Sequence, residues 1–274
     1  MKPRFRFLFV AMLLAALTQR TNAQGTIMNW TVDGEKREAL VFAPTTDMAV
    51  KRPLVLAFHG HGGNMQGAAQ LMHIHTAWPE AIVVYPQGLT HRPSPIDQQG
   101  NRTGWQVEAN QSAGGVGNKD LDFFDAMLAR IQQKYLVDDR RVYATGFSNG
   151  AVFSYLLWAE RNKVIAAIGE VAGRLWDSEH LTEPRPLLAI GGLADTTDPF
   201  TMQAASIETA RQADHATSNG QDCPAPNGAT GTKCTFFPST TQTPVKTLIH
   251  SGAHLYPTWA PSEIVKFFKN HAQP

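Results

Sequence analysis

Residues Arg141–Ala151 read RVYATGFSNGA, and this stretch decides the fold. Its opening letters, RVYAT, predict a short apolar strand, and Ala151–Glu160 (AVFSYLLWAE) predicts a helix after a sharp turn. The turn has the pattern G-x-S-x-G, with Ser148 between Gly146 and Gly150. Such a turn lifts a serine hydroxyl clear of a sheet, beside the free N–H groups of a helix N-terminus. The short pattern also arises by chance, so the chain must supply a base, an acid and a second oxyanion donor.

The composition is that of an ordinary globular protein. The chain has 274 residues, of which 43% are hydrophobic and 17% charged, and its formal net charge is +1. This length can bury one large core. The near-neutral charge gives no electrostatic reason to expect nucleic acid or an acidic membrane as a partner.

The N-terminus has the pattern of an export signal. Three basic residues within the first six positions precede the apolar run Phe7–Leu17, which is too short to span a bilayer comfortably. Small residues follow, up to Ala23. We expect a secretory signal peptide over residues 1–23 and one catalytic domain over 24–274, in a secreted or periplasmic protein. A retained membrane anchor is the alternative.

Export affects how the two cysteines are interpreted. Cys223 and Cys234 lie close together in the sequence, with several proline and glycine residues between them. In an oxidising compartment we expect them to form one disulfide that closes an irregular loop. A metal or redox role is a weaker alternative, because there is no second cysteine pair.

The remaining apolar runs predict an α/β protein of the α/β-hydrolase fold, with a mostly parallel central sheet and helices on both faces. We expect an antiparallel hairpin at Thr26–Val32 and Glu38–Phe42, strands at Pro53–Phe58, Ala81–Tyr85, Val164–Ile168, Pro186–Ile190 and Val245–Ile249, and helices at Asp120–Tyr135, Ile207–His215 and Pro261–Asn270.

A glycine-rich loop, His59–Asn64 (HGHGGN), follows the expected strand Pro53–Phe58. At the end of a core strand it matches the oxyanion loop of lipases and esterases, with the backbone N–H of His61 as one donor and that of Asn149 as the other. His59 is expected to pack and shape the loop. We expect no metal, since the histidines lack a third ligand at suitable spacing.

An acid and a base follow later strands, in the chain order that this fold requires. Asp195 comes first after a glycine turn and is the preferred acid, while Asp198 is the rival. His254 lies in the loop after the last expected strand and is the expected base. His250 stands at the strand end, where packing is the expected role.

The long polar stretch Leu89–Asn118 has no helical or strand periodicity. A loop of this length in a compact domain is usually functional or mobile. Trp105 lies within this stretch, and two interpretations of it are equally plausible. It forms a wall of the substrate cleft, or it attaches the loop to the body of the protein.

The sequence resembles the secreted feruloyl esterase and polyhydroxybutyrate depolymerase group of α/β hydrolases, which is similar to carbohydrate esterase family one. The motifs that carry the resemblance are HGHGGN at His59–Asn64, YPQG at Tyr85–Gly88, the helix start at Asp120–Phe124, RVYATGFSNGA at Arg141–Ala151, GGLADTTDP at Gly191–Pro199 and SGAHLYP at Ser251–Pro257. The resemblance implies a serine esterase without a metal cofactor. It implies Ser148 as nucleophile, Asp195 as acid and His254 as base, and a late disulfide between the two cysteines.

The expected substrates are feruloyl or acetyl esters linked to plant polysaccharide, and no nucleic acid or membrane partner is expected once the signal is removed. The alternatives are a depolymerase of short-chain polyhydroxyalkanoate, a peptidase, and an inactive hydrolase fold that serves as a binding protein. Tyr256 stands where the family often has tryptophan, and we expect it at the rim of the substrate cleft.

Overall fold

The computed structural model describes residues 25–45, 49–90, 97–112, 115–176, 181 and 183–273. The expected signal peptide, residues 1–23, lies outside these ranges. Among the described residues, no helix has both the length and the apolar character needed to cross a membrane.

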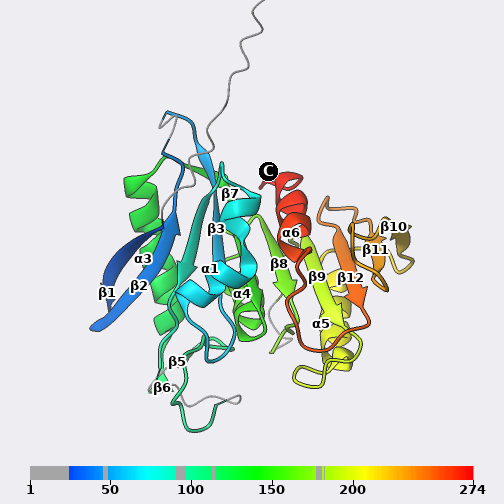
Figure 1. The fold of residues 1–274 in the computed structure, drawn as a ribbon, viewed down its shortest axis with the longest axis horizontal. Helices are drawn as coiled ribbons and strands as arrows, with labels where there is room; N and C mark the ends of the chain where they lie inside the picture. Colours follow the sequence, from blue (N-terminus) through cyan, green and yellow to red (C-terminus); the bar gives the residue numbers. More distant parts are fainter. Residues whose placement is uncertain are drawn as a thin grey trace, which may run out of the picture.

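A ten-stranded sheet forms the centre of the described chain, in the order β1-β2-β4-β3-β7-β8-β9-β12-β11-β10 (Figure 1). The strands are β1 (Thr26–Val32), β2 (Glu35–Phe42), β3 (Arg52–Phe58), β4 (Ile82–Pro86), β7 (Val137–Phe147), β8 (Ala167–Val171), β9 (Leu187–Gly192), β10 (Gln221–Cys223), β11 (Lys233–Phe237) and β12 (Val245–His250). A separate two-stranded ribbon pairs β5 (Gln111–Ser112) with β6 (Gly115–Val116).

The sheet is parallel in its middle and antiparallel at both edges. The strands from β4 to β12 in the sheet order pair in parallel, whereas β1 and β2 at one edge and β10 and β11 at the other pair antiparallel. The mostly parallel sheet predicted from the sequence is therefore confirmed. Since parallel strands end at the same edge, the loops after β3, β7, β9 and β12 are brought together there.

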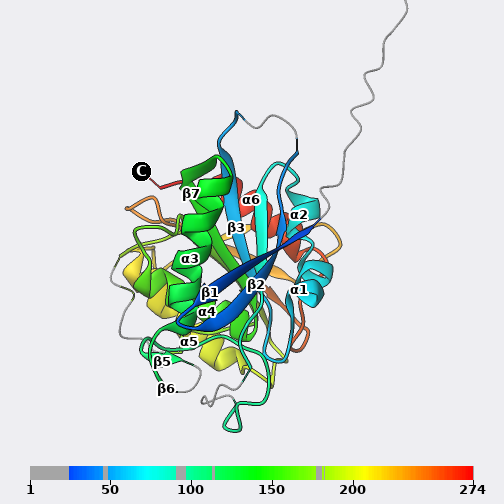
Figure 2. The ribbon, with the colours of Figure 1, turned by 90° about the vertical axis from the view of Figure 1, so that its left-hand side faces the viewer.

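Six helices of the described chain pack in two layers: α1 (Met65–Met72), α2 (Ile74–Ala77), α3 (Lys119–Lys134), α4 (Asn149–Glu160), α5 (Phe200–Ala213) and α6 (Ala260–Lys269). Buried side chains of α3, α4 and α5 share one core cluster, and those of α1, α2 and α6 share the other. Figure 2, seen from the β1 edge, shows α3 on one side of the sheet and α1 and α2 on the other.

Strand β3 shows how the two cores are separated. Leu54, Leu56 and Phe58 belong to one cluster, while Val55 and Ala57 belong to the other, and all five are buried. Successive side chains of a strand point to opposite faces, so a strand covered on both faces is apolar throughout.

The structure corrects three expected elements. Helix α5 begins at Phe200, directly after Pro199, and ends at Ala213, whereas the sequence predicted it at Ile207–His215. Strand β8 lies at Ala167–Val171 rather than at Val164–Ile168, because Val164 and Ile165 belong to the turn after α4, where their N–H groups bond to the Arg161 carbonyl. The region around the cysteines is not irregular throughout, because β10 and β11 form an antiparallel ladder there.

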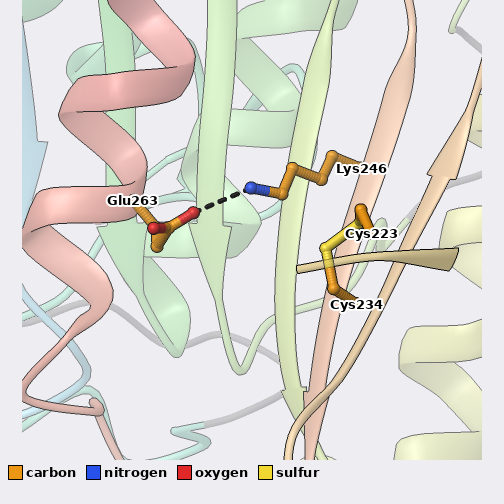
Figure 3. The surroundings of a disulfide bond; sticks show 4 residues. All are labelled: Cys223, Cys234, Lys246 and Glu263. Carbon is orange, nitrogen blue, oxygen red and sulfur yellow. Dashed lines mark hydrogen bonds and ion pairs between the residues drawn. A yellow bond between two sulfur atoms is a disulfide. The ribbon is translucent and has the colours of Figure 1, made fainter. Parts of the chain in front are cut away.

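The expected disulfide is present. Cys223 and Cys234 are directly opposite each other in the ladder of β10 and β11, with their Cα atoms 5.1 Å apart (Figure 3). Strand β11 also pairs with β12, and Lys246 of β12 forms an ion pair of 2.7 Å with Glu263 of α6. The bridge therefore fastens the edge strand β10 to strands that are tied to the body of the protein.

Candidate active site

Ser148 stands between β7 and α4 in an unusual backbone conformation. Its φ and ψ are +55° and −122°, and its own N–H donates to the carbonyl of Val171 at 2.9 Å. Non-glycine residues rarely adopt such a conformation, which costs on the order of 1–3 kcal/mol and persists only where the surrounding structure enforces it. Helix α4 begins at the next residue, Asn149, so unpaired N–H groups of the helix start lie next to the serine.

The two glycines of the turn are required by close backbone packing. A Cβ atom on Gly146 would lie 2.1 Å from the carbonyl carbon of Gly150, and a Cβ atom on Gly150 would lie 2.2 Å from the carbonyl oxygen of Phe58. Real Cβ atoms do not approach other atoms so closely. Strand and helix can therefore meet at Ser148 only with glycine at both positions, as the sequence pattern predicts.

Asp195 and His254 form a hydrogen-bonded pair. The distance from Asp195 Oδ2 to His254 Nδ1 is 2.7 Å. The other carboxylate oxygen, Oδ1, accepts from the backbone N–H groups of Thr197 and Asp198, both at 2.9 Å. Gln203, 1% exposed on α5, donates from Nε2 to Asp195 Oδ2 at 2.9 Å. These bonds hold the carboxylate at a fixed angle to the imidazole.

The rival residues have other partners. Asp198 Oδ1 lies 3.2 Å from Arg174 Nε, and burial raises the pKa of Asp198 to about 6. His250 Nδ1 accepts from the N–H of Gly252 at 3.0 Å, and burial lowers the pKa of His250. Of these acids and histidines, Asp195 and His254 are the two that the structure pairs.

The imidazole of His254 lies over the residue that precedes the serine. Its ring centre is 5.0 Å from that of Phe147, with the planes tilted by 34°. Phe147 is the last residue of β7, directly before Ser148. The histidine from the β12 loop and the serine from the β7 turn are thus brought to the same end of the sheet.

The glycine-rich loop also reaches the serine. A Cβ atom on Gly60 would lie 3.4 Å from Ser148 Cβ. Gly62 has φ +75° and donates its N–H to the Thr103 carbonyl at 2.7 Å. A Cβ atom on Gly104 would lie 3.0 Å from Asn149 Oδ1 and 3.2 Å from His61 Nδ1. The residues expected to supply the oxyanion donors, His61 and Asn149, therefore approach each other across Gly104.

His59 has the packing role expected of it. It is 3% exposed, and its Nε2 accepts from the N–H of Gly88 at 3.0 Å. Its Nδ1 lies 2.8 Å from the Gly60 carbonyl and must carry the proton, because both atoms would otherwise be acceptors. Burial lowers the pKa of His59 to about 4, so the ring is neutral at pH 7. Within the described ranges, no three His, Cys, Asp or Glu side chains are grouped so as to hold a metal ion.

Trp105 lies in the core. The prediction that it forms a wall of the substrate cleft is therefore wrong, and the alternative, that it attaches the long loop to the body of the protein, is confirmed. The side chain is 1% exposed, and its Nε1–H donates to the His59 carbonyl at 3.0 Å. Its backbone N–H and carbonyl bond to Oδ1 and Nδ2 of Asn149, at 2.8 and 3.1 Å. Trp105 therefore fastens the long loop to the first residue after the serine.

Tyr256 is also buried rather than exposed at a rim. It is 8% exposed, and its ring meets Phe147 edge-on, with 5.9 Å between the ring centres. Its hydroxyl has no hydrogen-bond partner, and burial raises its pKa well above the usual value. Tyr256 lines a hollow of about 460 Å³ between α1, α2 and α6, together with Leu71. The aromatic character of this position did not reveal which way the side chain points.

The sequence reasoning missed three residues near the pair. Gln203 bonds directly to Asp195, and Arg174 pairs with Asp198 and covers the ring of Trp176, with 4.3 Å from its guanidinium carbon to the ring centre. None of the three belongs to a recognisable motif. Only the spacing of Gln203, eight residues after Asp195 on a helix that packs beside β9, could have suggested a contact.

No protein-family model matches the chain. "Probable feruloyl esterase C" of Aspergillus clavatus is 32% identical over 150 residues, covering 54% of this chain and 50% of that protein. The bifunctional acetylxylan esterase/xylanase of Neocallimastix patriciarum is 25% identical over 169 residues, covering 59% of this chain and 22% of that protein. The chain thus spans half or less of the length of these two relatives.

Among solved structures, the acetyl xylan esterase from Aspergillus awamori superposes with a TM-score of 0.68 at 16% identity, covering 89% of this chain and 99% of that one. This likeness concerns the fold alone. The sheet and the comparisons together show an α/β-hydrolase fold, and the chain is similar to proteins named as feruloyl and acetylxylan esterases.

Proposed function

We propose that the protein is a secreted serine esterase that hydrolyses carboxylic esters, namely feruloyl or acetyl esters of plant polysaccharide. The observation that carries the proposal is the pair of Asp195 and His254, joined at 2.7 Å, at the sheet end where Ser148 stands in its strained turn. The relatives named as feruloyl and acetylxylan esterases support this substrate class. The disulfide supports export, since such bonds persist in oxidising compartments.

In this proposal His254 accepts the proton of the Ser148 hydroxyl while the oxygen attacks the ester carbonyl. Asp195 orients the imidazole and stabilises its protonated form. The backbone N–H groups of Asn149 and His61 hold the oxyanion of the tetrahedral intermediate, and one such donor is worth about 3–4 kcal/mol. The intermediate collapses, the C–O bond to the alcohol breaks, and His254 returns the proton to the departing alcohol.

Water then completes the cycle. His254 removes a proton from water as the water oxygen attacks the acyl-Ser148 carbonyl, and a second tetrahedral intermediate forms. Its collapse releases the carboxylic acid and returns the proton to the serine oxygen. No group besides those of the chain, the ester and water is needed for these steps to balance.

The test measures kcat/KM of the mature enzyme on methyl ferulate, acetylated xylan and a hydroxybutyrate oligomer. Ser148→Ala should abolish turnover of every ester that the enzyme cleaves, and Asp195→Asn should lower kcat by roughly 10⁴-fold. Asp198→Asn is the matched control on methyl ferulate, which carries no saccharide, and its kcat there should stay within about tenfold of the wild type, because that carboxylate faces Arg174 instead of His254.

Two outcomes would contradict the proposal. Hydrolysis that survives in Ser148→Ala would exclude the acyl-serine mechanism. Preference for the hydroxybutyrate oligomer over both plant esters would assign the protein to the depolymerase alternative, which rests on the sequence resemblance alone.

A further inference from the structure

A groove runs along one side of α4, the helix that follows the serine. It has a volume of about 290 Å³, and its floor is formed by Val152, Leu156 and Glu160 of α4. One wall comes from the long loop and includes Glu108, and the other comes from the segment after β8 and includes Trp176. This groove is distinct from the hollow beside Tyr256, which lies against the helices of the other layer.

The near end of the groove, at Val152, lies one helical turn from the nucleophile. Val152, Leu156 and Glu160 are spaced by four residues within α4, so they lie along one side of the helix. At a rise of 1.5 Å per residue, Val152 stands about 6 Å along the helix axis from Ser148. The segment that forms the far wall also passes close to the serine, because a Cβ atom on Gly173, two residues before Leu175 of that wall, would lie 3.0 Å from the Ser148 carbonyl oxygen.

The aromatic wall is held in place by charged neighbours. The guanidinium of Arg174 stacks on Trp176, and its Nε lies 3.2 Å from the carboxylate of Asp198. Asp198 in turn donates its backbone N–H to Asp195. The indole is therefore fixed relative to the acid of the Asp195–His254 pair, as a binding platform requires.

The side chains that line the groove determine which class of ligand it can bind. Glu108 and Glu160 place carboxylates in the groove, which disfavours an anionic ligand and offers acceptors to hydroxyl groups. An indole ring offers a flat apolar face to the C–H groups of a pyranose. A polyester chain has no hydroxyl donors along its length, so it would offer no hydrogen bond to either carboxylate.

We propose that this groove binds neutral sugar units of the alcohol part of the ester, with the ester itself at Ser148. This deepens the proposed function, on which it rests, by making a saccharide chain part of what the enzyme recognises. Trp176 then acts as the stacking platform, and Glu108 and Glu160 accept hydrogen bonds from sugar hydroxyls.

The first experiment measures binding without catalysis. The full chain with Ser148→Ala is titrated with unesterified xylotetraose by calorimetry. Trp176→Ala in that background should weaken binding at least tenfold, and Glu160→Gln should weaken it less. Leu71→Ala, an exposed apolar residue of the other hollow, is the control and should change binding less than twofold.

The second experiment measures selectivity. The ratio of kcat/KM for a feruloylated xylo-oligosaccharide to that for methyl ferulate should fall at least tenfold in Trp176→Ala and stay within twofold in Leu71→Ala. An unchanged ratio, or xylotetraose that does not bind the Ser148→Ala protein, would overturn the groove proposal. The esterase proposal is judged separately, by turnover of methyl ferulate in the wild type.

Discussion

Ser148 holds a backbone conformation that suits glycine better than any other residue. Its φ of +55° with ψ of −122° is imposed by the junction of β7 and α4. We expect Ser148→Gly to be more stable than Ser148→Ala by about 1 kcal/mol, because relief of strain exceeds the entropy that glycine adds to the unfolded chain. Urea unfolding of the two inactive variants measures the difference. Equal stabilities would mean that the relief of strain does not exceed the entropy cost of glycine.

Gln203 is a positioning residue for the acid. Its Nε2 shares the Oδ2 atom of Asp195 with His254, and it weakens the attraction between the carboxylate and a protonated imidazole. Gln203→Leu removes this competing bond, so the carboxylate acts more strongly on the imidazole, and the acid limb of the kcat/KM profile should move to higher pH.

The control for this change is Gln212→Leu, an exposed residue of the same helix that bonds to Glu208. Its pH profile should match that of the wild type. A profile of Gln203→Leu that falls equally at all pH values would reduce Gln203 to a purely structural role.

Among helices, strands and turns, the sequence predicted most accurately those whose conformation is determined by a short local segment. The turn at Ser148 is dictated by two glycines that no other residue could replace. The start of β8 was misplaced because Val164–Val171 is almost continuously apolar, and a strand buried on both faces has no alternation to mark where it begins. Strands β10 and β11 were missed because their ladder depends on pairing with the distant β12.

The sequence also did not predict which way individual side chains point, and this affected the candidate site most. Trp105 and Tyr256 were placed in the correct loops, but both rings turn inward, toward His59 and Phe147. The direction is set by partners far away in the sequence, which a local pattern does not contain. Trp176 in the groove and Gln203 beside Asp195 were missed for the same reason.

The disulfide acts on an element that has few other attachments. Strand β10 is three residues long and pairs with β11 alone, at the edge of the sheet. Replacing both Cys223 and Cys234 by serine should lower the free energy of unfolding by about 2–3 kcal/mol, the value for closing a loop of this size.

This prediction is tested by chemical denaturation of the double variant and of the wild type with and without reductant. Ester turnover at low temperature should remain within about twofold, since β9 and the main part of β12 keep their pairing. Loss of turnover in a folded double variant would show that the edge strands position His254.

At the scale of the whole molecule, one buried carboxylate links stability to pH. Asp214 ends α5 and is fully buried, with Oδ1 accepting from the Arg185 N–H at 2.7 Å and Oδ2 lacking a partner. Burial raises its pKa to about 8, well above the value near 4 of an unfolded chain. The folded state therefore holds the proton more tightly, and this contribution to stability is lost as pH rises toward and through 8.

Asp214→Asn should remove that dependence. Between pH 5 and 8.5 the free energy of unfolding should fall less in the variant than in the wild type, while the amide oxygen keeps the bond from Arg185. Asp222→Asn, at an exposed position of β10, is the control and should follow the wild type. Parallel curves for Asp214→Asn and the wild type would exclude this carboxylate as the cause.

The long loop is fastened to the body at a few closely spaced points. Thr103 bonds to the glycine-rich loop through Gly62 and Gly63, and Trp105 bonds to Asn149 through both of its backbone groups. These anchors hold the part of the loop that lies nearest to the reaction centre. Mutations of the groove-lining residues after Trp105 leave these bonds in place. Substrate preference can therefore evolve through such mutations while the enzyme stays active.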